Sequence, residues 1–233
     1  MLSTTNLAFV AGVGVTLLTG VPGTPPAPAE LPPVTGRLTV RERNDRSAGD
    51  VQQAVVWLVP ARGEAPRPAA VTVDVITEHK TFSPHVTVVT PGSTVRFPNR
   101  DGFNHNVFSL TESDPFDLGL YDRGEGKPVL FRNAGIVSVF CNVHSTMSAM
   151  VLVLPTPWWT QPNADGTFTL PGVPPGEYVL HAWHERAGES SQPVTVTAAG
   201  LALDDLTLDA RGYVARGHLN KYGRPYARTG RRY

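Results

Sequence analysis

The sequence predicts an all-β protein built of sandwiches or barrels, on three observations. Glycine and proline number 22 each in 233 residues, which favours many turns and few long helices. Short strand-like runs follow one another closely along most of the chain. Turn signals such as Pro91-Gly92 and Asp165-Gly166 separate most of these runs. At 41% hydrophobic and 17% charged residues the chain can bury a core, which excludes a disordered protein.

The N-terminal residues 1–29 are predicted to be a secretory signal peptide. Residues 7–21 form an apolar run of about 15 residues, which is short for a membrane span, and small residues suited to cleavage follow at 27–29. Since no Lys or Arg precedes Arg37, an uncleaved anchor and a misplaced start codon stay open as alternatives. We expect a periplasmic or otherwise exported protein that contacts a membrane only through this segment, if it is uncleaved.

The candidate strands follow a Pro/Ala-rich linker at residues 22–33. They are residues 37–41, 54–59, 71–76, 85–90, 94–98, 106–110, 129–131, 136–141, 150–154, 167–170, 178–183, 193–197 and 201–208. Residues 111–120 could contain one or two helical turns, and no longer helical period is present.

The last segment, residues 211–233, is a basic tail without an apolar pattern. It holds seven of the 20 Lys and Arg residues and no acid, so 13 basic residues stand against 20 acidic ones in the rest of the chain. The tail could dock on the acidic body or on an acidic partner, and solvated disorder is an equal alternative. The chain is formally neutral and predicted to be exported, so we expect no nucleic-acid partner.

The only cysteine lies close to other candidate metal ligands. Cys141 ends a predicted strand, and His144 and Met147 follow at intervals of three residues. His105 precedes another strand and can face this loop across one end of a sandwich. Two imidazoles, a thiolate and a weakly bound thioether form the blue-copper ligand set, whereas zinc does not need the methionine. The sequence therefore predicts one copper ion held by His105, Cys141, His144 and Met147.

The region from about residue 70 to residue 154 resembles the cupredoxins of the plastocyanin and amicyanin type. The resemblance rests on TFSPHVTVVTPGSTVRFPNRD, on His105-Asn106-Val107 and on the short Cys-x-x-His-x-x-Met spacing. It implies a Greek-key β-sandwich with one type 1 copper ion. Cys141 would then be the thiolate ligand, and His105 and His144 the equatorial imidazoles.

The same resemblance implies further roles around the ion. Met147 would be the axial ligand, Asn106 would tie the two ligand loops together, and His144 would lie near solvent as the electron portal. Met150 also lies near the loop and is the alternative axial ligand. Since it follows His144 by six residues, we favour a place for Met150 in the last strand, packed in the core.

A second module is indicated by ADGTFTLPGVPPGEYVL, residues 164–180, which resembles the carboxypeptidase regulatory-like, transthyretin-like or Ig-like β-sandwich. Its usual opening is found far upstream, at residues 35–40 and 54–60. We therefore predict a discontinuous sandwich of residues 34–66 and 156–210, with the cupredoxin domain, residues 67–155, inserted. The competing arrangement is two successive domains, with residues 35–60 as extra cupredoxin strands.

The predicted function is one-electron transfer by an exported copper protein with a redox partner protein of unknown identity. Copper carriage or storage, and a non-catalytic binding or scaffold role, are the alternatives. We expect no enzyme, since no nucleophile elbow or P-loop is present. The histidines of HAWHE, His181 and His184, would diverge on a strand and make a poor second metal site.

Overall fold

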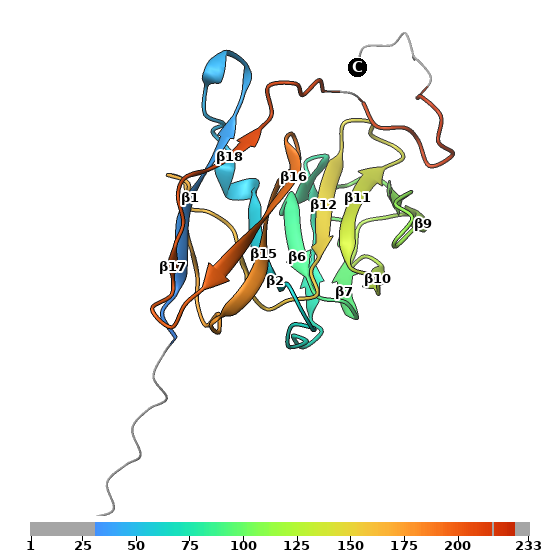
Figure 1. Ribbon diagram of the computed structural model, residues 1–233. Helices are drawn as coiled ribbons and strands as arrows, with labels where there is room; N and C mark the ends of the chain where they lie inside the picture. Colours follow the sequence, from blue (N-terminus) through green and yellow to red (C-terminus); the bar gives the residue numbers. More distant parts are fainter. Residues whose placement is uncertain (1–30, 216, 227–233) are drawn as a thin grey trace, which may run out of the picture. The chain divides into compact units, whose positions relative to one another are not determined.

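The computed structural model describes residues 31–215 and 217–226, and these residues form an all-β structure (Figure 1). The predicted signal peptide, residues 1–29, lies outside the described residues. Within the described ranges, no helix is long and apolar enough to cross a membrane.

The central sandwich, as we call strands β3 to β12, has two main sheets. Their orders are β6-β12-β11-β8-β9 and β10-β7-β3, and β4 and β5 form a separate pair. The two sheets enclose one apolar core that includes Phe97, Phe131 and Val151. The strands are β3 (Thr72–Asp74), β4 (Ile76–Glu78), β5 (Thr81–Ser83), β6 (Val86–Val89), β7 (Ser93–Arg96), β8 (His105–Ser109), β9 (Phe116–Tyr121), β10 (Pro128–Phe131), β11 (Gly135–Cys141) and β12 (Ser148–Val153).

The terminal-strand sandwich, our name for β1, β2 and β13 to β18, combines both ends of the described chain. Strand β1 pairs with β14, β17 and β18, and the other sheet has the order β13-β2-β15-β16. Leu38, Leu58 and Leu180 lie in its core. The strands are β1 (Val34–Arg41), β2 (Val55–Pro60), β13 (Trp159–Thr160), β14 (Thr167–Leu170), β15 (Gly176–His184), β16 (Gly188–Val196), β17 (Leu201–Ala202) and β18 (Leu206–Asp209), with 3-10 helices at Arg43–Asp45 and Val51–Gln53.

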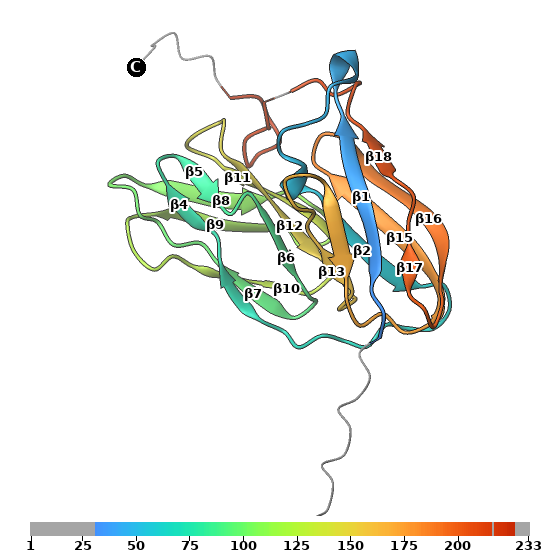
Figure 2. The same ribbon diagram turned by 90° about the vertical axis from the view of Figure 1, so that its left-hand side faces the viewer.

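A third apolar cluster joins the two sandwiches, which lie side by side in Figures 1 and 2. Trp57 on β2 and Trp183 on β15 pack in this cluster against Met150 and Leu152 on β12. Strand β12, whose sequence SAMVLV is mostly apolar, is therefore buried on both faces.

An ion pair between the sandwiches supplements this cluster. His85 Nε2 lies 2.6 Å from Glu185 Oε2, and both side chains are about two-thirds buried. The hydrogen bond to Glu185 raises the pKa of His85 above its ordinary value of 6.5. The same bond lowers the pKa of Glu185 below 4.5.

We expect Glu185→Gln to lower the free energy of unfolding mainly in mildly acidic solution, by roughly 1–2 kcal/mol. The contribution from His85 is full below its unfolded pKa of about 6.5 and fades as pH rises through the higher folded value. The contribution from Glu185 is full above about 4.5 and fades as pH falls through the lower folded value. Chemical denaturation of both proteins across this range should show the largest difference between these two pH values. A difference independent of pH would contradict the assignment.

Several element boundaries differ from the sequence expectation. The predicted strand at residues 71–76 is two strands, β3 and β4, interrupted at the fully buried Val75. Residues 111–120, where helical turns were possible, instead contain most of β9, because residues 105–109 offer an unpaired edge to which this segment binds. Strand β5 was not predicted, since three residues carry too little periodicity to be recognised.

Candidate metal centre

Strand β11 delivers Cys141 to the inside of the central sandwich. Val137, Val139 and Cys141 are fully buried in its core, while the residues between them point to the other face. This alternation is the two-residue period of a strand with one apolar face. Strand β8, which begins at His105, pairs with β11 so that Val107 lies opposite Cys141. The two predicted ligand segments are therefore neighbours in one sheet.

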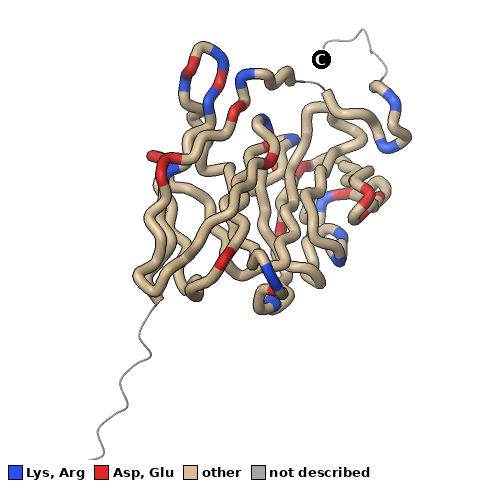
Figure 3. The backbone as a smooth tube through the Cα atoms, in the orientation of Figure 1, with Lys and Arg blue, Asp and Glu red and all other residues tan. Residues whose placement is uncertain are grey.

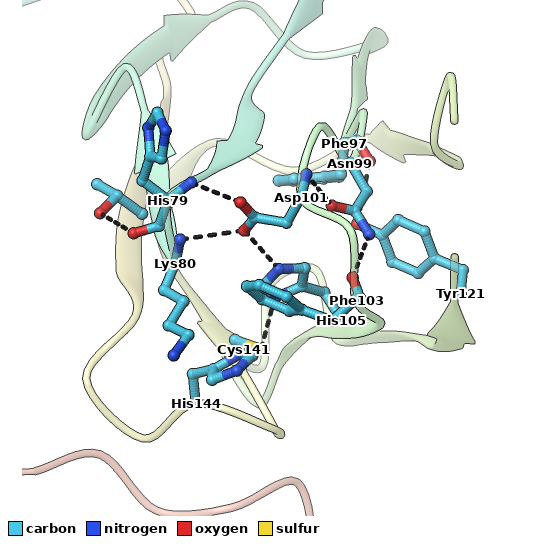
Figure 4. Close-up of polar contacts among 11 residues, drawn as sticks. His79, Lys80, Phe97, Asn99, Asp101, Phe103, His105, Tyr121, Cys141 and His144 are labelled. Carbon is cyan, nitrogen blue, oxygen red and sulfur yellow. Dashed lines mark hydrogen bonds and ion pairs between the residues drawn. The ribbon is translucent and has the colours of Figure 1, made fainter. Parts of the chain in front are cut away.

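The two histidines approach the thiol from different segments. His105 Nδ1 lies 3.5 Å from Cys141 Sγ, and His144 Nδ1 lies 3.7 Å from the same sulfur. One ligand atom from each of these residues lies within 4.8 Å of the other two. Figure 4 shows both rings beside Cys141. The structure thus brings together three of the four predicted ligands, although 36 residues separate His105 from Cys141.

These distances suit a shared metal ion. Bonds of about 2.3 Å to sulfur and about 2.0–2.1 Å to nitrogen, meeting at roughly 105–120°, separate the two donors by about 3.5–3.8 Å. The observed separations of 3.5 and 3.7 Å fall in that interval. The same separations also allow a thiol hydrogen bond to an imidazole in the metal-free protein. The two sulfur–nitrogen separations therefore fit a shared metal ion.

The loop after Cys141 places Met147 beside it. The Met147 amide donates to the His144 carbonyl at 3.1 Å, and the Cys141 amide donates to the Met147 carbonyl at 3.2 Å. Met147 is 1% exposed and packs in the same core as Cys141. Met150 packs instead in the cluster between the sandwiches, on the opposite face of β12 from Ala149. Of the two methionines, only Met147 shares the core in which the thiol lies.

A buried carboxylate, Asp101, holds His105 from the other side. His105 Nε2 lies 2.9 Å from Asp101 Oδ2, and the amides of His79 and Lys80 donate to the same carboxylate at 2.7 and 3.0 Å. Figure 4 shows the carboxylate between these amides and the imidazole. With Nε2 engaged, the Nδ1 atom of His105 is left to face the sulfur, as in the carboxylate–histidine–metal arrangement.

Asp101 carries a charge despite its burial. Desolvation alone would raise its pKa, but the bonds from the Lys80 amide, the His105 ring and the His79 amide together outweigh it and lower the pKa. In the sequence, Asp101 was visible only as the last residue of the cupredoxin-like segment TFSPHVTVVTPGSTVRFPNRD, with no role assigned to it. The Asn-x-Asp spacing of Asn99 and Asp101, four residues before His105, is the signal that could have identified it, because the Asn99 side chain accepts from the Asp101 amide and tightens the turn.

Asn106 joins the two ligand segments through its main chain. Its carbonyl accepts a hydrogen bond from the Asn142 amide at 2.8 Å, so the main chain links the two segments directly. Its side chain donates at 2.5 Å to Asp117 on β9. The role of Asp117 could not be recognised from the sequence, because β9 was not predicted as a strand.

His144 lies at the edge of the site. Its ring is 5.4 Å from that of Phe103, which is 42% exposed, and 4.8 Å from that of His105. Burial, with a smaller effect from His105, lowers the pKa of His144. The imidazole is therefore neutral in neutral solution and keeps a lone pair for a metal ion.

The structure keeps the histidines of HAWHE apart, as expected for a strand. His181 stacks on Trp57 with ring centroids 4.9 Å apart, whereas His184 is 1% exposed. Within the described part of the chain, His105, Cys141 and His144 form the one group of three or more His, Cys, Asp or Glu side chains that could hold a metal ion.

Comparison with solved structures gives cupredoxins among the similar chains. A purple cupredoxin from Nitrosopumilus maritimus is 20% identical, with a TM-score of 0.32 over 35% of this chain and 99% of its own. Amicyanin from Paracoccus versutus is 20% identical, with a TM-score of 0.32 over 42% of this chain and 97% of its own. A Cu-containing nitrite reductase from Thermus scotoductus SA-01 is 25% identical, with a TM-score of 0.34 over 41% of this chain and 25% of its own.

Sequence comparison addresses the terminal-strand sandwich. The family described as polysaccharide lyase family 4, domain II, matches residues 156–202, which cover part of that sandwich. No curated protein sequence matches the chain. The resemblance to carboxypeptidase regulatory-like domains therefore stays a prediction.

Proposed function

We propose that this protein holds one copper ion with His105, Cys141, His144 and Met147 and carries single electrons. The observation that supports this most directly is the convergence of both Nδ1 atoms on one buried sulfur, at 3.5 and 3.7 Å. Bound copper would supply the Cu(I)/Cu(II) couple. The soft thiolate and the two imidazoles favour copper over the hard cations.

The surrounding residues would keep the ligands in one arrangement. Asp101 orients His105, and two backbone hydrogen bonds close the loop between Cys141 and Met147. The apolar core beneath the thiol excludes water. Ligands that are fixed before the metal binds move little when its charge changes, which lowers the barrier to a one-electron step. Tight positioning of this kind favours electron transfer over rapid metal exchange.

His144 is the proposed contact point for a redox partner protein. Its ring is partly exposed and lies beside the exposed Phe103 and near Val143, which is 46% exposed. A small apolar edge around a metal ligand would allow close approach of another protein without a large desolvation cost. We also propose that the protein is exported, and that electron transfer rather than catalysis on a substrate is its role.

The proposed domain division follows the strand pairing. Strands β1 and β2 pair with strands between Trp159 and Asp209, and no pairing with β3 to β12 occurs among the described residues. This supports an inserted copper domain, residues 67–155, inside a discontinuous sandwich of residues 34–66 and 156–210.

Addition of Cu(II) to the purified protein tests the proposed function. We expect one equivalent to bind and to produce an intense colour from Cu–thiolate charge transfer, which disappears on reduction and returns on reoxidation. A copper carrier or storage protein should bind copper but exchange it readily and cycle poorly. A scaffold protein should show neither colour nor stoichiometric binding. Either of the last two results would replace electron transfer with the corresponding alternative.

A further inference from the structure

The C-terminal segment of residues 217–226 lies against the outer face of the sheet that carries the metal centre. The His218 ring stacks on that of Phe140, with centroids 4.4 Å apart and planes 18° apart. Phe108 on β8 lies 6.2 Å from the same ring and is fully buried. In Figure 1 this segment, coloured red, runs beside the end of β11. Of the three outcomes left open for the tail, docking on the body therefore holds for these residues.

Polar contacts join this segment to the residues of the metal centre. The Tyr226 hydroxyl donates to the carbonyl of Cys141 at 2.9 Å. The Lys221 amide donates to the Asn142 side chain at 3.0 Å. The Lys221 ammonium lies 2.8 Å from Asp117, which also accepts the hydrogen bond from Asn106. The segment thus reaches the cysteine ligand directly and the His105 segment through one carboxylate.

A turn within the segment directs these contacts to one place. The Asn220 carbonyl accepts from the Gly223 amide at 2.8 Å, and the Asn220 amide donates to the Arg224 carbonyl at 2.8 Å. The positive φ of 69° at Gly223 allows the chain to reverse here. Lys221 and Tyr226, on either side of the reversal, both return to the end of β11. Figure 3 shows basic residues of the segment 217–226, in blue, near acidic residues around β9, in red.

We propose that residues 217–226 form a strap that positions Cys141 and the loop after it, and so slows the release of copper. This inference rests on the proposed function, because it assigns the strap to the same metal centre. The neighbouring apolar core already fixes one side of β11. The strap fixes the other side, where the strand ends and its backbone groups would otherwise face water. Tyr226 and Lys221 are positioning residues, since neither is placed to touch the ion.

The test compares two tyrosines of the same segment in the full chain. Tyr226→Phe removes only the hydroxyl that binds Cys141. Tyr222→Phe, the matched control, removes a hydroxyl from a side chain that is 72% exposed. With copper-loaded protein and excess Cu(I) chelator, we expect Tyr226→Phe to release copper roughly five times faster, the equivalent of about 1 kcal/mol for one hydrogen bond. Its Cu–thiolate absorption band should shift, and the control should match the wild type in both measurements.

Hydrogen exchange in the metal-free protein provides a readout that does not depend on copper. The amides of Asn142 and Met147 are both bonded within the ligand segments, to Asn106 and His144. Their exchange should accelerate in Tyr226→Phe and further in a chain ending at residue 216. If the wild type binds no copper but exchange accelerates, the proposed function fails and the strap stands. If both release and exchange equal the wild type in both variants, the strap is refuted.

Discussion

Replacing Cys141 by serine is expected to abolish the colour of the copper-loaded protein. The charge-transfer band requires a thiolate, and a serine hydroxyl is both a harder donor and difficult to deprotonate. The Cys141 sulfur also faces both imidazoles, at 3.5 and 3.7 Å. Absorption and electron paramagnetic resonance spectra, with one equivalent of Cu(II), would measure the loss.

A relocated thiol is the matched control for this variant. Ser145 lies exposed in the same loop. The double variant Cys141→Ser with Ser145→Cys keeps one thiol per chain but moves it from the buried end of β11 to an exposed loop position. We expect it to remain without the band, whereas Ser145→Ala alone should keep it. Colour retained in Cys141→Ser would show that the thiolate is not a ligand and would end the electron-transfer proposal.

The second large effect is expected at Met147. Met147→Leu should keep the colour and raise the reduction potential by more than about 59 mV, the equivalent of a tenfold change in the relative affinity for the two oxidation states. The reason is that a thioether donor stabilises Cu(II), so its loss favours Cu(I). Methionine and leucine have similar volumes, so the fold should be retained. Cyclic voltammetry of the adsorbed or dissolved protein would give the potential.

Met150→Leu is the control for Met147→Leu, because it makes the same chemical change outside the core that holds Cys141. Met150 packs between the sandwiches with Trp183, away from the core that holds Cys141. We therefore expect no change in potential. A shift at Met150 with none at Met147 would assign the axial position to Met150.

The local features of the centre could be predicted because they depend on neighbours in sequence. Cys141 and its inward-pointing companions Val137 and Val139 follow a two-residue period. The spacing of Cys141, His144 and Met147 fits one short loop after that strand. Both patterns lie within fewer than a dozen consecutive residues. Over so short a stretch, backbone geometry limits the directions in which the side chains can point.

The partners of these residues could not be predicted in the same way. Asp101 was visible only as the end of the cupredoxin-like segment, and the Asn-x-Asp spacing indicates a tight turn but not that the carboxylate bonds to His105. Tyr226 lies 85 residues from Cys141, in a tail whose composition allowed disorder equally well. Residues 111–120, where one or two helical turns were possible, contain most of β9 instead. Pairing with the free edge of β8 outweighed the weak helical preference of this segment.

The all-β class, the alternation of residues 137–141 and the choice of candidate metal ligands can be read from the sequence alone. The meeting of His105 with Cys141, the pairing of β1 with β18 and the stacking of His218 on Phe140 depend on the folded chain. The cause of this difference is that periodicity reports which face of a strand avoids water. It does not report which distant surface covers that face, and the summed burial of many contacts across the chain decides that choice.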